Sequence, residues 1–276
     1  MDRRIFVFLA VFLLFVSTGC NNQPAQDVQK ALTAEEIRDK SIDAMEKATS
    51  YEFETEMNIN TKLKNPEASP IGLREVDWTI EGTGKFDKKN KKMYMDMTMD
   101  MFGVKMNMEQ YIIGDTQYIK MPMLGWVKNK TGEDIWSQEY AQMEVEFLRN
   151  VPVILEGTEN VNSKECYVLK INPEVNDLMK LLSKNYQPGM SMNMRVDEMG
   201  NIVKSVELKE WIDKDTFLVS RMWMAMNMEN ENMTTNLVMT VDMHNYNEPM
   251  SIELTEDAKN AQGIASLGSG AMGTGL

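Results

Sequence analysis

Methionine sulfur is the most abundant soft donor in this sequence, which holds 27 methionines among 276 residues. From Met93 to Met101 a methionine occupies every second position, and methionine-rich runs recur at 190–194, 222–228 and 239–243. Thioethers select Cu(I), and side chains two positions apart on a strand lie about 7 Å apart, close enough for flexible arms to meet on one ion. A Cu(I)-binding, methionine-rich protein is therefore the first hypothesis that the pattern raises.

The same methionines also fit an apolar wall. Strict alternation puts them on one side of each expected strand, together with residues such as Val104 and Leu237. His244, the only histidine, alternates with Asp242 on the polar side, away from the nearby methionines. Packed cores favour Leu, Ile and Val, whose rotamers are better defined, whereas methionine adapts to several apolar partners. The pattern favours a soft-walled lipid cavity, with a ligand-free packed core and a Cu(I) site as alternatives.

The predicted cavity lining comes from the apolar side of several strands. We expect it to comprise Phe53, Met57, Trp78, Met95, Met97, Met99, Met101, Met106, Met108, Met192, Met222, Met224, Met226, Met239 and Met243. The favoured hypothesis includes neither a metal site nor a cofactor.

Composition and motif content disfavour two other function classes. The formal net charge of −13 argues against a nucleic-acid partner, because phosphate binding depends on clustered Lys and Arg. The sequence has one histidine, no Gly-x-Ser-x-Gly elbow and no phosphate loop placed between a strand and a helix. We therefore expect no enzymatic activity.

The N-terminus predicts export and lipidation. A basic start is followed by the apolar run 5–16, which is too short to cross a bilayer of about 30 Å and is typical of a signal peptide. The small residues of 17–19 lead into Cys20, an arrangement like a lipobox, in which the thiol receives a diacylglyceryl group. We expect a signal peptide at 1–19 and a lipidated tether at 20–32. The protein would then sit on the extracytoplasmic face of the cell membrane, and plain secretion is the alternative.

Periodicity predicts a mostly β domain over 33–260. Thr33 and Glu36 form a capping box before a helix at 34–49, and further helices are expected at 133–150 and 173–186. Alternation predicts the strands and hairpins at 51–63, 76–86, 93–101, 104–108, 111–121, 152–159, 165–171, 190–197, 201–212, 215–229 and 232–245. The predicted class is α+β, with one large curved antiparallel sheet whose apolar face is covered by the helices. The Gly-rich residues 261–276 are expected to be a disordered tail.

Three phrases carry a family resemblance. They are "IIGDTQYIKMPMLGW" (112–126), "EWIDKDTFLVSRM" (210–222) and "HNYNEPMSIEL" (244–254). In these phrases and in the order of its elements over about 35–255, the chain resembles the outer-membrane lipoprotein-sorting proteins (LolA/LolB-like), including the LppX-type lipoproteins. The resemblance implies a half-open β-barrel whose concave apolar face, lidded by helices, receives acyl chains. It implies fold more strongly than function.

These observations converge on a hypothesis with two alternatives. The favoured function is a membrane-anchored extracytoplasmic lipoprotein that binds a lipid or the acyl chains of another lipoprotein, as carrier or receptor. An envelope sensor of the same fold is the first alternative, and the Cu(I)-binding protein is the second. The expected partners are the membrane, through Cys20, and an acyl-chain ligand.

Overall fold

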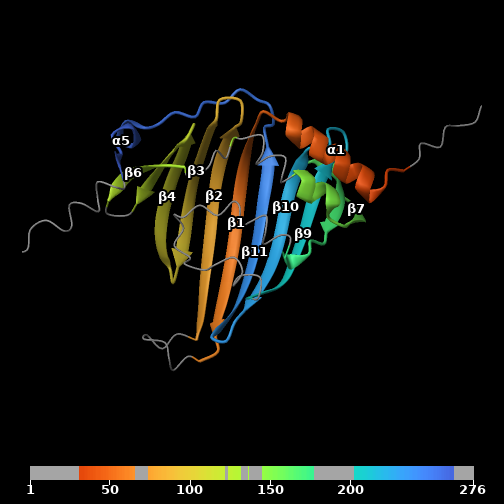
Figure 1. The fold of residues 1–276 in the computed structure, drawn as a ribbon, viewed down its shortest axis with the longest axis horizontal. Helices are drawn as coiled ribbons and strands as arrows, with labels where there is room; N and C mark the ends of the chain where they lie inside the picture. Colours follow the sequence, from red (N-terminus) through yellow and green to blue (C-terminus); the bar gives the residue numbers. More distant parts are fainter. Residues whose placement is uncertain are drawn as a thin grey trace, which may run out of the picture. The chain divides into compact units, whose positions relative to one another are not determined.

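One twelve-stranded sheet dominates the residues that the structure describes (Figure 1). The computed structural model describes residues 31–65, 74–121, 124–131, 136, 145–176 and 202–263. The compact unit that the structure describes begins at Thr33. The predicted signal peptide and Cys20 lie outside the described residues, as do most of the helices expected at 133–150 and 173–186 and the strand expected at 190–197.

The sheet is a pair of meanders that meet at its centre. Its strands are β1 (Ser50–Leu63), β2 (Glu75–Asp87), β3 (Lys92–Met101), β4 (Val104–Ile113), β5 (Thr116–Met121), β6 (Gly125–Lys130), β7 (Val153–Val161), β8 (Lys164–Ile171), β9 (Val203–Asp213), β10 (Val219–Glu229), β11 (Met233–His244) and β12 (Gln262–Gly263). Their spatial order is β12-β6-β5-β4-β3-β2-β1-β11-β10-β9-β8-β7. All pairs are antiparallel except β12 with β6.

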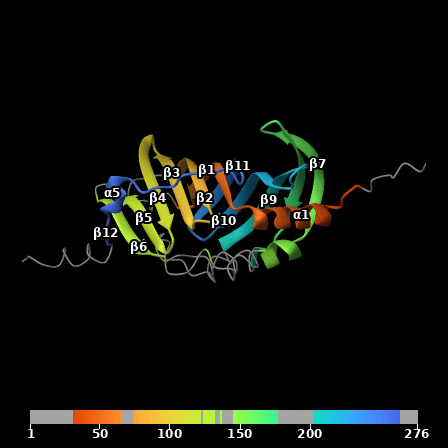
Figure 2. The same ribbon diagram turned by 90° about the horizontal axis from the view of Figure 1, so that it is seen from above.

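The sheet is open, because β12 and β7 are its two edges and do not pair with each other within the described residues. Seen from above, the strands follow a curved line that does not close into a ring (Figure 2). The predicted large antiparallel sheet with few helices is therefore confirmed.

The first helix forms where the capping box predicts it. In α1 (Ala34–Lys47) the Thr33 hydroxyl accepts from the Glu36 N–H at 3.2 Å, and the Glu36 carboxylate accepts from the Thr33 N–H at 2.8 Å. Ile37, which is fully buried, lies on the face of α1 that meets the sheet. The helix contacts β7 and β8, so it covers one end of the sheet.

Most of the buried core lies at the two ends of the sheet. At the β4–β6 end, the short helix α5 (Glu256–Lys259) and its flanking residues pack on aromatic side chains. That cluster consists of Tyr111, Trp126, Ile252, Ala258 and Ala261. At the other end the fully buried side chains are Ile37, Leu169, Ile212 and Cys166. These two groups of buried side chains stabilise the outer strands, and the central strands lie between them.

Two residues of the expected disordered tail belong to the sheet. Gln262 and Gly263, expected in the disordered tail, pair in parallel with Val127 and Lys128 of β6. The physical reason is that the preceding Ala261 is buried in the aromatic cluster and holds the chain beside the edge strand.

Candidate functional site

The methionines of β3 and β4 are aligned side by side. Met97 pairs with Met108, and Met99 pairs with Met106, so these four residues form a block on neighbouring strands. Directly opposed residues of an antiparallel pair lie on the same side of the sheet, with Cβ atoms about 5 Å apart. The alternating run that opens at Met93 therefore contributes to a surface shared by two strands.

A second methionine row crosses the centre of the sheet. Met57 of β1 pairs with Met239 of β11, which pairs in turn with Met224 of β10. On its other side Met57 pairs with Ile80 of β2, which pairs with Met99 of β3. The two rows are therefore parts of one surface that runs from β4 to β10.

We call this surface the methionine face. By register it includes all the predicted lining residues that the structure describes, namely Phe53, Met57, Trp78, Met95, Met97, Met99, Met101, Met106, Met108, Met222, Met224, Met226, Met239 and Met243. Met192 lies outside the described residues. The same register adds residues that the prediction omitted, namely Tyr51, Ile59, Ile80, Phe86, Met93, Met228 and Met233. Their alternation with polar neighbours was the signal that could have identified them.

The methionine face is not packed like the ends of the sheet. Among the described residues no methionine is fully buried, and those of the face are half-buried. Close to the turn between β3 and β4, Phe102 and Val104 are 55% and 61% exposed. The face is therefore an apolar surface that remains partly open to solvent.

Two glycines of β2 shape the centre of this face. A Cβ atom on Gly84 would lie 2.1 Å from Cζ of Phe53, and one on Gly82 would lie 2.7 Å from Cγ of Met97. Both side chains thus lean over bare backbone. The two glycines leave a shallow depression in the face, and the Phe53 ring and the Met97 side chain fill it.

Helical and aromatic residues cover the margins of the face. The ring of Trp136 packs on Phe86 with centroids 5.2 Å apart, and its indole N–H donates to the Gly114 carbonyl at 2.8 Å. Near the opposite margin, Phe147 of the helical residues 145–150 packs in a cluster that includes Met226. These contacts place cover at two margins of the methionine face.

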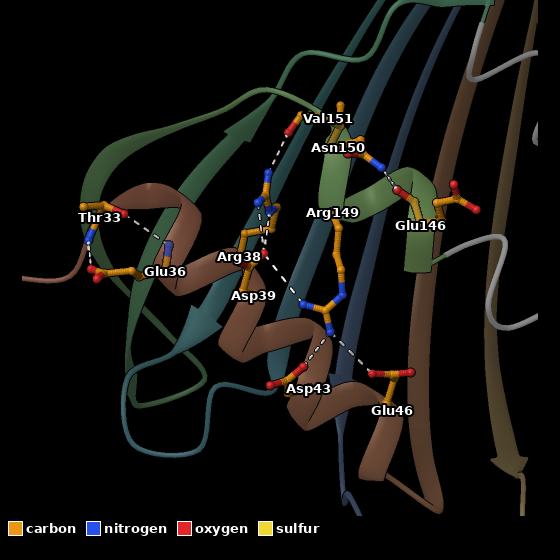
Figure 3. A network of polar contacts seen from close by, with 10 residues as sticks. All are labelled: Thr33, Glu36, Arg38, Asp39, Asp43, Glu46, Glu146, Arg149, Asn150 and Val151. Carbon is orange, nitrogen blue, oxygen red and sulfur yellow. Dashed lines mark hydrogen bonds and ion pairs between the residues drawn. The ribbon is translucent and has the colours of Figure 1, made fainter.

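Ion pairs join that helical segment to α1, as Figure 3 shows. The Arg149 guanidinium reaches Asp43 at 2.6 Å, Glu46 at 3.6 Å and Asp39 at 3.9 Å. Hydrogen bonding to Asp43 raises the pKa of Arg149 and lowers that of the Asp43 carboxyl. Arg38 of α1 also donates to the Val151 carbonyl at 3.0 Å. Helix α1 and the segment 145–150 are thus linked as one cover.

The opposite side of the sheet is polar and acidic. An open depression of about 610 Å³ lies there, lined by Glu54, Glu56, Glu81 and Asp96 among others. At its edge Arg221 donates twice to Asp242, at 2.7 and 2.9 Å, and this hydrogen bonding raises the pKa of Arg221. The alternation of Glu52, Glu54 and Glu56 marks this face in the sequence as solvated sheet.

A cysteine and a histidine, Cys166 and His244, lie in the part of the chain that the structure describes. Cys166 is fully buried, and burial raises the pKa of its thiol. His244 lies on the polar side, with Nε2 3.8 Å from a Glu52 oxygen. Within these residues no group of three or more His, Cys, Asp or Glu side chains could hold a metal ion.

One polar atom at the edge of the methionine face has no partner. The indole N–H of Trp78 is shielded from solvent, and it is the buried side-chain donor among the described residues that finds no acceptor. Its neighbours across the sheet are Ile59 and Met101. An apolar environment with one unpaired hydrogen-bond donor suits a ligand that is mostly hydrocarbon and carries one hydrogen-bond acceptor.

Several solved structures are similar to this one in fold. It is similar to the Mycobacterium tuberculosis lipoprotein LppX, with 14% identity over 80% of this chain and 98% of that chain and a TM-score of 0.42. It is also similar to LprF from Mycobacterium bovis (11% identity, 80% and 96% coverage, TM-score 0.43). A LolA-superfamily protein from Nitrosomonas europaea matches at 10% identity, with 80% and 96% coverage and a TM-score of 0.25. These are the groups that the sequence resembles, and at such identities the likeness concerns the fold alone.

The chain belongs to a family of unknown function (DUF6612), whose profile matches residues 33–263. Among curated proteins none matches the sequence. A search of the described residues for a helix long and apolar enough to cross a membrane finds none.

Proposed function

We propose that this protein is a membrane-anchored extracytoplasmic lipoprotein that binds a lipid, or the acyl chains of another lipoprotein, on its methionine face. The observation that carries the proposal is the partial exposure of one continuous apolar face from β4 to β10. Large exposed apolar patches on soluble domains are characteristic of binding surfaces. A hydrocarbon guest would complete the burial that the ends of the sheet already have.

The side chains of the face suit guests of variable length. Methionine is unbranched and polarizable, so it adapts to differently shaped apolar partners. Each CH₂ group that leaves water contributes about 0.8 kcal/mol, so an acyl chain can bind tightly with little polar recognition. Trp78 could donate one hydrogen bond to an ester or carboxylate oxygen at the edge of the face.

The two cover elements have a defined place in this proposal. α1 and residues 145–150 would form a lid over one margin of the face, joined through Arg149. Lipidation at Cys20 would hold the domain at the membrane from which the guest is drawn. The role is carrier or receptor, without catalysis.

Native mass spectrometry of the full chain, extracted gently in detergent, tests the proposal. We expect a co-purified lipid mass, or stoichiometric uptake of added palmitate by the empty protein. Bound copper that palmitate does not displace would support the Cu(I) alternative instead. An empty protein that refuses palmitate would contradict lipid binding.

A further inference from the structure

The methionine face gathers oxidisable sulfur where solvent can reach it. Met97, Met99, Met224 and Met239 are half-buried and occupy the two aligned rows described above. A thioether is oxidised to the sulfoxide when an oxidant can reach its sulfur, whereas burial protects it. The arrangement therefore exposes a set of equivalent targets on one surface.

The thiol that the structure describes does not compete for the same oxidant. Cys166 of β8 is fully buried, and burial raises the pKa of its thiol. Since the thiolate is the reactive form, this cysteine is protected both by its lack of contact with solvent and by its protonation. Oxidation of this domain would therefore concentrate on methionine.

The choice of residue is itself informative. Among the described residues the largest fully buried side chains, which lie at the ends of the sheet, are those of Ile, Leu, Val and Cys, and no methionine is one of them. Leucine would supply comparable apolar burial on the open face without an oxidisable atom. Methionine is thus concentrated in the region where oxidant and ligand have access.

We propose that the methionine face is a site of reversible two-electron oxidation that releases the bound ligand. A peroxide such as hydrogen peroxide transfers one oxygen atom to the sulfur. An S–O bond forms with two electrons from sulfur, the O–O bond breaks, and the departing oxygen takes up the protons and leaves as water. Each event converts a methionine into its sulfoxide. The effect on ligand release rests on the proposed function, whereas the modification itself does not.

The consequence follows from the polarity of the product. A sulfoxide is a strong hydrogen-bond acceptor, and covering it with hydrocarbon leaves that acceptor unpaired. Because Met57, Met239 and Met224 lie in one row, an oxygen on any of them would face the same guest. Ligand affinity would therefore fall in steps as oxygens accumulate, and sulfoxide reductases would restore it.

Peptide mapping after peroxide treatment tests the modification. The full chain is exposed to hydrogen peroxide, quenched, digested and analysed by mass spectrometry, while circular dichroism checks that the sheet persists. We expect oxygen on Met97, Met99, Met224 and Met239 under conditions that leave Cys166 reduced. Unmodified methionines at these positions, or oxidation that occurs only after the sheet unfolds, would overturn the proposal.

A matched variant tests the effect on the ligand. The variant carries Met97→Leu, Met99→Leu, Met224→Leu and Met239→Leu, and the probe is a fluorescent fatty acid. Peroxide should weaken binding to the native chain about tenfold or more, with recovery after treatment by methionine sulfoxide reductases. The affinity of the variant before treatment serves as its own reference, and peroxide should lower that affinity much less than it lowers the affinity of the native chain.

The possible outcomes distinguish failure of oxidative release from failure of the proposed function. Unchanged affinity of the oxidised native chain, or equal loss in the leucine variant, would overturn oxidative release. If the leucine variant does not fold, the pair Met97→Leu and Met99→Leu replaces it, with a smaller loss of protection expected. If the untreated native chain does not bind the probe, the proposed function fails, release is overturned with it, and peptide mapping still decides the oxidation site.

Discussion

The ends and the centre of the sheet are built from different side chains. The ends fully or almost fully bury side chains such as Leu169, Ile212 and Trp126, whereas the centre presents methionines that are only partly buried. Branched side chains favour one packing arrangement, whereas the flexible methionine side chain can adopt several. The difference indicates that the ends supply the stability of the fold, while the centre is left adaptable for a guest.

Truncation at an end should produce the largest loss of stability. Ile212→Ala removes a fully buried side chain and should lower the free energy of unfolding by about 2–5 kcal/mol, because a cavity remains. Met224→Ala at the centre should cost less, about 1 kcal/mol, since its side chain is only partly buried and loses less apolar burial. Urea denaturation of both variants measures the difference, and equal losses would show that the centre is a packed core.

Adding a side chain at Gly84 should lower the free energy of unfolding by an intermediate amount. Gly84→Ala puts a methyl group where the Phe53 ring lies and should cost about 1–3 kcal/mol, because the ring must move. Gly263→Ala, which meets nothing within 4 Å, is the matched control. In a Phe53→Ala background the Gly84→Ala cost should fall markedly. An unchanged cost there would show that the strain lies in the backbone.

Acid should weaken one end through Asp213. Burial alone would raise the pKa of this carboxyl, but the N–H groups of Thr216 and Asp215 and the Lys164 ammonium outweigh burial and lower it below the usual 3.8. Because the pKa is lower in the folded state, the stabilisation is present above about pH 3.8 and is lost as the pH falls through the folded pKa.

Asp213→Asn tests that acid dependence. Denaturation curves from pH 7 to pH 3 should show a lower starting stability for the variant and a shallower loss on acidification. Asp215→Asn, an exposed neighbour in the same turn, is the charge-matched control. Parallel curves for the Asp213 variant and the native chain would contradict the assigned contacts.

The smallest expected effect is at the lid. Arg149→Ala removes the ion pairs with α1, which are exposed and therefore weak. A slight loss of stability at low salt should disappear at about 1 M salt, where such pairs are screened. A loss that persists in high salt would show that Arg149 acts by packing instead of pairing.

Local features of the fold were predictable because they depend on near neighbours in the chain. The capping box at Thr33, the alternation of 93–101 and the hairpin turn at Gly114 all use contacts within a few residues. The membership of one apolar face followed from the same alternation. These features required no knowledge of which strands pair.

Long-range features were not predictable in the same way. The pairing of β1 with β11 joins residues that are far apart in the sequence, and it alone brings Met57 beside Met239. The same is true of the edge pairing by Gln262 and of the Phe53 ring lying over Gly84. How far the methionines remain exposed depends on how the sheet is covered, which alternation does not report.

Ligand uptake by two charge-matched variants tests the central claim most directly. One variant carries Met97→Asp, Met99→Asp and Met224→Asp on the methionine face, and the other carries Asn58→Asp, Asn107→Asp and Asn236→Asp on the polar face. Both add three negative charges, and circular dichroism confirms folding. The methionine-face variant should lose uptake of a fluorescent fatty acid, and the polar-face variant should keep it. Uptake by a folded methionine-face variant at the native level would contradict the assignment of this face as the ligand site.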